Sequence, residues 1–319
     1  MIKLNSLSVF LILSVVVCFP NFSLAQQNTP GMILNDETAK MKNSGIVDFL
    51  PFFNTQTKKN GHSSPLPFGL AVSGLAYEQD FNSTDLKIKA TTNIGQDIFA
   101  YGDTITQKTT AGESKAYIKP NIWVFPFLNV YGIIGFTWGQ INPELFIEGI
   151  TIKDLPGIGD YHIDTSVYLN NEIKYLGNTY GFGTTFSMGY KNLIFLLDYH
   201  FTVTKPYDID GNLNNHFLSS KVAWIINPKA KRLNIMVWVG AMYMNNNQSF
   251  KGEITVEEIA PELVPYFGEI AEYSGNIEAK NNWNALIGSS LTIYKHHNVF
   301  IEFGFINRQQ ASVGYGFMF

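Results

Sequence analysis

Cysteine is almost absent from this sequence of 319 residues, and charged residues are scarce. The single cysteine, Cys18, lies in an N-terminal apolar run, so we expect no disulfide framework and no thiol catalysis in the rest of the chain. Charged residues make up 15% of the sequence, whereas a typical soluble domain has about 25%. The net charge of −4 gives no indication of the basic surface that nucleic-acid binding needs.

Long apolar runs are missing after the N-terminus. Met1–Lys3 is a short basic start, Leu7–Phe19 is an apolar run, and Ser23–Ala25 supplies small residues before Gln26. This pattern predicts a secretory signal peptide over residues 1–25, cleaved after Ala25. Lipidation at Cys18 is the rival interpretation, but the small residue that precedes a lipidated cysteine is not there. No later stretch has the roughly 18 consecutive apolar residues that a transmembrane helix needs.

Aromatic residues and glycine are plentiful, and they follow a period of two. In the last ten residues, Ala311, Val313, Tyr315, Phe317 and Phe319 are apolar, and the residues between them are small, polar or slender. This alternation predicts a strand. The segment resembles the closing strand of bacterial outer-membrane β-barrels, in which the aromatic C-terminus is the tag for the barrel-assembly machinery. The resemblance implies an assembly signal at Tyr315, Phe317 and Phe319.

Similar alternation recurs along the chain and predicts ten strands, at residues 68–79, 115–125, 130–140, 179–190, 193–202, 216–226, 233–244, 283–294, 299–307 and 310–319. Short turns alternate with long connections, which is typical of outer-membrane barrels. Only a closed barrel satisfies the backbone of strands in lipid. We therefore predict an all-β, transmembrane up-and-down antiparallel barrel over residues 66–319, preceded by a periplasmic arm at 26–65. Twelve strands would result if the weaker segments 86–91 and 104–109 also paired in the barrel.

Turns and loops complete this topology. Short turns around Pro126, Lys191, Pro228 and His296 would lie on the periplasmic side, and the long connections would lie outside the cell. One long acidic loop, 245–281, contains a helical spacing over Thr255–Tyr273. Aromatic residues near strand ends predict a girdle at each membrane interface. They are Phe125, Phe127, Tyr190, Trp224 and Tyr294 at the periplasmic rim, and Tyr77, Trp138, Tyr199, Tyr243 and Trp283 at the other.

The same alternation turns most charged side chains of the predicted strands toward the lumen. They are Lys115, Lys119, Asp198, His200, Lys221, Glu302 and Arg308. Because isolated buried charges are costly, we expect a paired network that fills the barrel. A narrow polar pore or a pocket for an unidentified small molecule is the alternative. The slender face of the last strand, including Gly314 and Gly316, favours a filled interior.

Asp198 and His200 lie two residues apart on one predicted strand, where a carboxylate can orient an imidazole as a general base. Outer-membrane proteases of the omptin type and lipid A deacylases use related pairs. The second acidic pair of omptins is not found, and Thr202 stands where a deacylase has serine. The sequence predicts a non-enzymatic channel, ligand-binding or structural surface barrel; the alternatives are an enzyme using His200 and Asp198, or a soluble secreted β-protein.

Partners and cofactors follow from this interpretation. We expect the protein in the bacterial outer membrane, with membrane lipid and the barrel-assembly machinery as partners. No nucleic acid, cofactor or metal is expected. Asp208–Asn214 has oxygen ligands at alternate positions, as in a calcium loop, but lacks the closing bidentate glutamate.

Overall fold

The computed structural model describes residues 50–53, 65–92, 97–155, 159–170, 172–207, 211–226, 233–259, 264 and 267–319. The predicted signal peptide and most of the predicted arm, residues 26–49 and 54–64, lie outside this range. Strands dominate the described residues, and within them no helix is long and apolar enough to cross a membrane.

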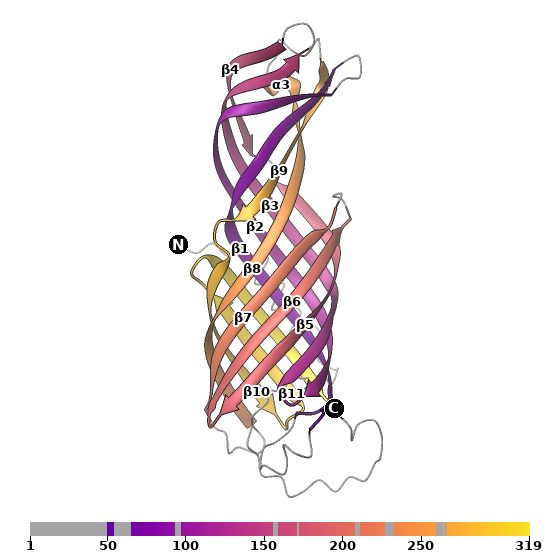
Figure 1. The fold of residues 1–319 in the computed structure, drawn as a ribbon, viewed down its shortest axis with the longest axis vertical. Helices are drawn as coiled ribbons and strands as arrows, with labels where there is room; N and C mark the ends of the chain where they lie inside the picture. Colours follow the sequence, from indigo (N-terminus) through magenta and orange to yellow (C-terminus); the bar gives the residue numbers. More distant parts are fainter. Residues whose placement is uncertain are drawn as a thin grey trace, which may run out of the picture.

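Ten strands close into a barrel (Figure 1). They are β1 (Phe68–Thr92), β2 (Asp97–Phe125), β3 (Leu128–Leu155), β5 (Ile173–Tyr190), β6 (Leu193–Pro206), β7 (Leu213–Ile225), β8 (Leu233–Thr255), β10 (Trp283–Ile293), β11 (His297–Gly304) and β12 (Arg308–Met318). Each strand pairs antiparallel with the next around the ring, and β12 pairs with β1. The prediction of a closed up-and-down antiparallel barrel of ten strands is confirmed.

The seam between the first and last strands is continuous. Its register runs from Gly69 opposite Met318 to Gln79 opposite Arg308. Beyond β12, the Phe319 amide donates to the Phe68 carbonyl at 2.9 Å, and the Phe68 amide donates back to Phe319 at 3.2 Å. The sheet therefore has no open edge at this junction.

Short turns connect the strands at the end of the barrel where the C-terminus lies, the lower end in Figure 1. Three of the four predicted turns are described, at residues 126–127, 191–192 and 294–296; the fourth, at Pro228, lies outside the described residues. Tyr294 and Lys295 both have positive φ, 51° and 64°. The His296 amide donates to the Ile293 carbonyl at 3.2 Å, and positive φ at both residues between them is typical of a type I′ turn.

Four strands continue beyond the upper end of the barrel, where the sequence predicted loops. There β1, β2, β3 and β8 form a second sheet with β4 (Gly159–Asn170) and β9 (Phe267–Ala279), in the order β4-β3-β2-β1-β9-β8. We call the described residues of 81–109, 141–170 and 248–279 the extension (Figure 1). The segments 86–91 and 104–109 are continuations of β1 and β2, so the possibility of a twelve-stranded barrel is wrong.

The predicted helix over Thr255–Tyr273 is also largely wrong. The helix α3 covers only Val256–Ile259, and β9 begins at Phe267. Pairing of β9 with both β1 and β8 outweighs the helical spacing, because it satisfies the backbone on two sides. Ala271 and Ile277 then alternate into the interior as strand residues do.

Side-chain polarity reverses between the barrel and the extension. On β3 the apolar side chains Ile134, Phe136 and Trp138 point outward in the barrel and are exposed. Farther along the same strand, Glu148 is exposed instead, and Ile150 is completely buried. The barrel is thus apolar outside, whereas the extension is apolar inside.

The change of face on β3 occurs at Gly149. The inward positions in the barrel are odd-numbered, as at Ile133, but beyond Gly149 in the extension they are even-numbered, at Ile150 and Ile152. The register with β4 shifts between Glu148 and Ile150, and Gly149 has φ of 70°. The extra residue at this shift lies on β4, since Glu148 pairs with Ser166 and Ile150 with Ile163, and the left-handed conformation of Gly149 is one that glycine adopts at little cost.

The core of the extension has the composition of a soluble protein core. Its buried members are apolar side chains from β1, β2, β3, β4, β9 and α3, joined at the barrel end by Tyr175 of β5 and Leu213 of β7. They include Phe81, Ile88, Ala111, Ile150, Ile152, Ile163, Val256, Ala271 and Ile277. Contacts of α3 with β4, β8 and β9 cover one side of this core.

Exposed aromatic side chains lie near both ends of the outward-facing apolar band. Tyr190, Trp224 and Tyr294 are exposed toward the lower end, and Trp138 and Trp283 toward the upper end. Tyr77, which the sequence assigned to the upper girdle, is an exception: it is only 5% exposed and points inward. Its odd-numbered position on β1 matches the inward residues Ser73 and Gln79.

Candidate binding site in the barrel lumen

The structure brings all seven predicted charged residues to the inside of the barrel, in two groups at different heights. Lys115 and Arg308 lie in the upper group, near the extension. The lower group lines a cavity of about 160 Å³ and consists of Lys119, Asp198, His200, Lys221 and Glu302.

A buried layer closes the lumen between the cavity and the extension. At its centre Glu113 accepts hydrogen bonds from the Tyr77 hydroxyl, at 2.5 Å, and from the Tyr175 hydroxyl. The Lys115 ammonium lies 2.5 Å from the same carboxylate. Asn246 donates to the Tyr77 hydroxyl at 2.8 Å, so the layer joins strands from both sides of the barrel.

Arg308 completes this closing layer and is only 1% exposed. Its Nε donates to Gln310 and its Nη1 to Gln79, both at 3.0 Å. Its guanidinium also lies over the Tyr77 ring, 5.8 Å from the centroid. The apolar side chains that pack with Tyr77 at this level are Leu75, Phe217, Met242, Met244 and Leu286. We keep the name closing layer for Tyr77, Gln79, Glu113, Lys115, Tyr175 and Arg308.

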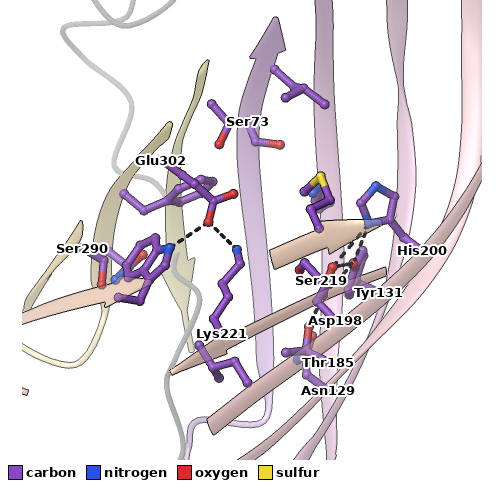
Figure 2. Close-up of a pocket in the computed structure, with 18 of the residues that line it drawn as sticks. Ser73, Asn129, Tyr131, Thr185, Asp198, His200, Ser219, Lys221, Ser290 and Glu302 are labelled. Atoms are coloured by element: carbon purple, nitrogen blue, oxygen red, sulfur yellow. Dashed lines mark hydrogen bonds and ion pairs between the residues drawn. The ribbon is translucent and has the colours of Figure 1, made fainter. Parts of the chain in front are cut away.

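One wall of the cavity below this layer is built around Asp198 (Figure 2). The Tyr131 hydroxyl lies 2.9 and 3.0 Å from its two oxygens, and the Thr185 hydroxyl donates at 2.6 Å. His200 Nδ1 lies 3.3 Å from Asp198, and the imidazole stacks on Phe217 at 4.4 Å. Asp198 therefore has three polar neighbours that stabilise its charge.

A second network holds Glu302, apart from the first in Figure 2. The Lys221 ammonium lies 2.6 Å from the Glu302 carboxylate, and the Trp238 indole donates to the same oxygen at 2.7 Å. Lys221 also lies over the Trp238 ring at 5.6 Å. The charges of Lys221 and Glu302 thus cancel, and the hydrogen bond from Trp238 holds the carboxylate in place.

Lys119 differs from the other cations of the cavity. Its ammonium lies 5.7 Å from the Tyr117 ring centroid and 5.4 Å from that of Tyr131. Among the described residues, no carboxylate lies within 4.0 Å of it. Aromatic rings stabilise such a cation only modestly, by about 0.5–2 kcal/mol.

The surroundings of His200 give little support to the alternative of a hydrolase. His200 Nδ1 faces Asp198 and Tyr131, and its ring face is covered by Phe217. Thr202, at the spacing where a deacylase has serine, is fully buried beside it. Within the described residues, no cluster of three His, Cys, Asp or Glu side chains could hold a metal ion. Asp208–Asp210, part of the calcium-like segment, lie outside those residues.

The three residues of the predicted assembly signal form an aromatic group near the lower end of the barrel. Tyr315 contacts His297, with 2.9 Å between its hydroxyl and Nδ1. The Phe317 ring lies 5.2 Å from that of His297 and 6.1 Å from that of Phe319. Phe319 in turn stacks on Phe68 at 6.2 Å.

Several residues of the lumen escaped the sequence reasoning. The main one is Glu113, which follows the same alternation as Lys115 but lies before the predicted start of that strand. Tyr77 was assigned to the membrane interface. Tyr131, Tyr175 and Trp238 carry no charge, so period-two alternation alone could not single them out as partners of carboxylates.

No family model matches the sequence, and no curated protein matches it. Solved structures with similarity include an outer-membrane channel from Pseudomonas putida F1, at 10% identity and a TM-score of 0.28, covering 79% of this chain and 96% of that one. The Ralstonia pickettii toluene transporter TbuX has 10% identity and a TM-score of 0.29, with coverage of 79% and 90%. The β domain of the Bordetella autotransporter BrkA has 8% identity and a TM-score of 0.27, with coverage of 77% and 99%. Because these scores are low, the barrel assignment depends on the strand pairing described above.

Proposed function

We propose that the protein is a bacterial outer-membrane barrel that has no open pore and holds its extension outside the cell as a structural or ligand-binding surface. The observation that carries the proposal is the reversal of side-chain polarity between barrel and extension. A surface that exposes apolar side chains around the whole barrel is unfavourable in water and favourable in lipid.

The length of the apolar band supports a membrane location. On β3 the outward positions are apolar or glycine from Val130 to Trp138, and polar side chains follow at Gln140, Asn142 and Glu144. On β1 the change comes at Glu78. A tilted strand crosses the bilayer core in about 9–11 residues, which fits this band.

The proposed orientation in the membrane rests on the connections between strands, which are short at one end of the barrel and long at the other. Outer-membrane barrels have short turns on the periplasmic side and longer segments outside. The turns at 126–127, 191–192 and 294–296 would then face the periplasm, and the extension would stand above the outer surface. Its exterior exposes charged side chains, among them Glu148, Glu272 and Glu278, and these suit water.

The closing layer argues against an open pore. Glu113, Lys115 and Arg308 are almost completely buried. Lys115 pairs with Glu113, Glu113 accepts a hydrogen bond from Tyr77, and Arg308 donates one to Gln79. A barrel of this size has an interior that side chains just fill. An ion would have to break these buried pairs, each costing several kcal/mol.

Three measurements on the full chain test the proposal. On a gel, the unboiled protein from outer-membrane fractions should migrate faster than the boiled protein. Reconstituted in planar bilayers, it should give no stable single-channel steps. Protease added to intact cells should cut the extension and leave the barrel. Recovery only in the soluble fraction would overturn the membrane location, and reproducible conductance would overturn the closed lumen.

A further inference from the structure

The cavity below the closing layer contains a cation, Lys119, that has no carboxylate within ion-pair distance among the described residues. The described lumen contains four cations, Lys115, Lys119, Lys221 and Arg308, and three carboxylates, Glu113, Asp198 and Glu302. Glu113 is paired with Lys115 and Glu302 with Lys221. Asp198 has Tyr131, Thr185 and His200.

Two cations remain without a carboxylate within ion-pair distance among the described residues, and they differ in access. Arg308 is sealed in the closing layer, where Gln79 and Gln310 accept its hydrogen bonds. Lys119 lines the cavity, and its contacts there are the rings of Tyr117 and Tyr131. Among the described residues, Lys119 is therefore the cation that faces the cavity without an ion pair.

Ser73 supplies a second polar group with no partner at the same place. Its side chain lines the cavity and is 7% exposed, and its hydroxyl has no hydrogen-bond partner among the described residues. On the neighbouring strands, Lys119 pairs with Ala71 and Tyr117 with Ser73, so Ser73 and Lys119 are diagonal neighbours on the inner face. Such neighbours lie about 7–8 Å apart, close enough for one small group to contact both side chains.

The rest of the cavity surface is mostly apolar. Leu196, Met236, Met242 and Phe300 contribute to its walls together with the two tyrosine rings. Its volume is about 160 Å³, and an apolar cavity of about 150 Å³ accommodates a benzene ring. A fitting molecule is thus small, has an apolar body, and carries one group that accepts hydrogen bonds from a cation and a hydroxyl.

We propose that the lumen cavity binds a small organic monocarboxylate with a ring-sized apolar body, whose carboxylate contacts Lys119 and Ser73. This site goes beyond the proposed surface role, and it does not depend on which membrane holds the barrel. The carboxylate forms an ion pair with Lys119 and accepts a hydrogen bond from Ser73, and the apolar body displaces water from the walls. The closing layer separates the ligand from the extension.

Benzoate is a suitable probe, and benzamide is its uncharged control of the same shape. Trp123 and Trp238 both line the cavity and report binding through their fluorescence, and calorimetry gives the affinity independently. The full chain, folded in detergent micelles, should bind benzoate saturably and at least about ten-fold more tightly than benzamide, because a hydrogen bond to a charged group is worth that ratio or more. Equal affinities for the two probes, or no saturable benzoate binding, would overturn the proposal.

Variants locate the site. Lys119→Met should weaken benzoate binding about ten-fold or more, whereas Lys119→Arg keeps the charge and should stay within a few-fold of the unmodified protein. Lys174→Met is the matched control, since Lys174 is exposed and paired with Glu172. Unchanged benzoate affinity in folded Lys119→Met would refute the assignment. If that variant does not fold, as judged by gel mobility, Ser73→Ala should still lower the affinity about three-fold, and no change there would refute it equally.

Discussion

The barrel and the extension are built partly from the same strands, yet they place their apolar side chains on opposite faces. In the barrel, the side chain of Ile134 on β3 points outward and is 55% exposed, and the Asp198 and Glu302 networks lie inside. In the extension, the same strand buries Ile150 completely and exposes Glu148. One chain therefore satisfies two surroundings, with lipid proposed for the barrel exterior and water for the extension.

The contrast shows how little a strand's alternation says about its environment. A period of two defines two faces, but it does not say which of them is packed. The neighbours decide: charged and tyrosine side chains pair inside the barrel, and aliphatic side chains cluster inside the extension. The following changes would break or sharpen this comparison.

The largest effect is expected from Glu113→Gln, in the layer where the two regions meet. The substitution leaves Lys115 buried without its counter-ion. Removing one partner of a buried pair costs about 3–5 kcal/mol, so the free energy of unfolding should fall by that amount in denaturant titrations of the folded protein. The double variant Glu113→Gln/Lys115→Met should recover much of the loss, and a double variant as unstable as the single one would contradict the pairing.

A somewhat smaller loss is expected in the extension alone. Ile150→Ala removes a completely buried side chain from its core, which costs about 2–5 kcal/mol. Limited proteolysis should then cut the extension faster, while the gel mobility of the unboiled barrel stays the same. The control is Glu148→Ala on the exposed face of the same strand. Equal protease resistance of the two variants would mean that the extension has no core of its own.

The outer face of the barrel gives the converse test. Ile134→Arg should lower the free energy of unfolding in lipid bilayers by about 2–4 kcal/mol, the cost of a cation near the middle of the membrane. Glu148→Arg, outward on the same strand but in the extension, should change it by less than about 0.5 kcal/mol. Similar effects at both positions would remove the proposed boundary between lipid and water.

The smallest change in stability is expected at the seam. Phe319→Ala removes stacking on Phe68 and Phe317, worth about 1 kcal/mol. If Phe319 also acts as the assembly signal, the amount of folded protein in the membrane should drop several-fold, far more than this small change explains. Normal membrane levels of the variant would count against the signal.

The barrel was accessible from the sequence because its strands alternate strongly. Bulky side chains such as Phe182, Phe186 and Tyr190 recur at every second or fourth residue of β5, and glycine or small polar residues lie between them. The extension was not accessible from the sequence, because its strand β9 turns the small residues Ala271 and Gly275 inward. Small residues at inward positions give a weak alternation. The change of face at the left-handed Gly149 also interrupts the pattern of β3.

The site was predictable residue by residue but not as an arrangement. Alternation is sufficient to turn Lys221 inward from β7 and Glu302 inward from β11. Their contact depends on how far around the ring the strands lie and on their stagger, and both come from the pairing of all ten strands. That Lys119 has no ion pair within 4.0 Å among the described residues is likewise visible only in the arrangement of all the lumen charges.

The seam has a consequence for how the molecule forms. Its two strands come from opposite ends of the strand order, so this ladder closes the longest loop in the fold. Until β12 reaches β1, each presents a row of unpaired amides and carbonyls that can recruit a strand from another chain. Loop closure over such a separation is slow, and folding rates fall as contacts become less local. Whatever shields the edge of β1 during that delay protects the chain from aggregation.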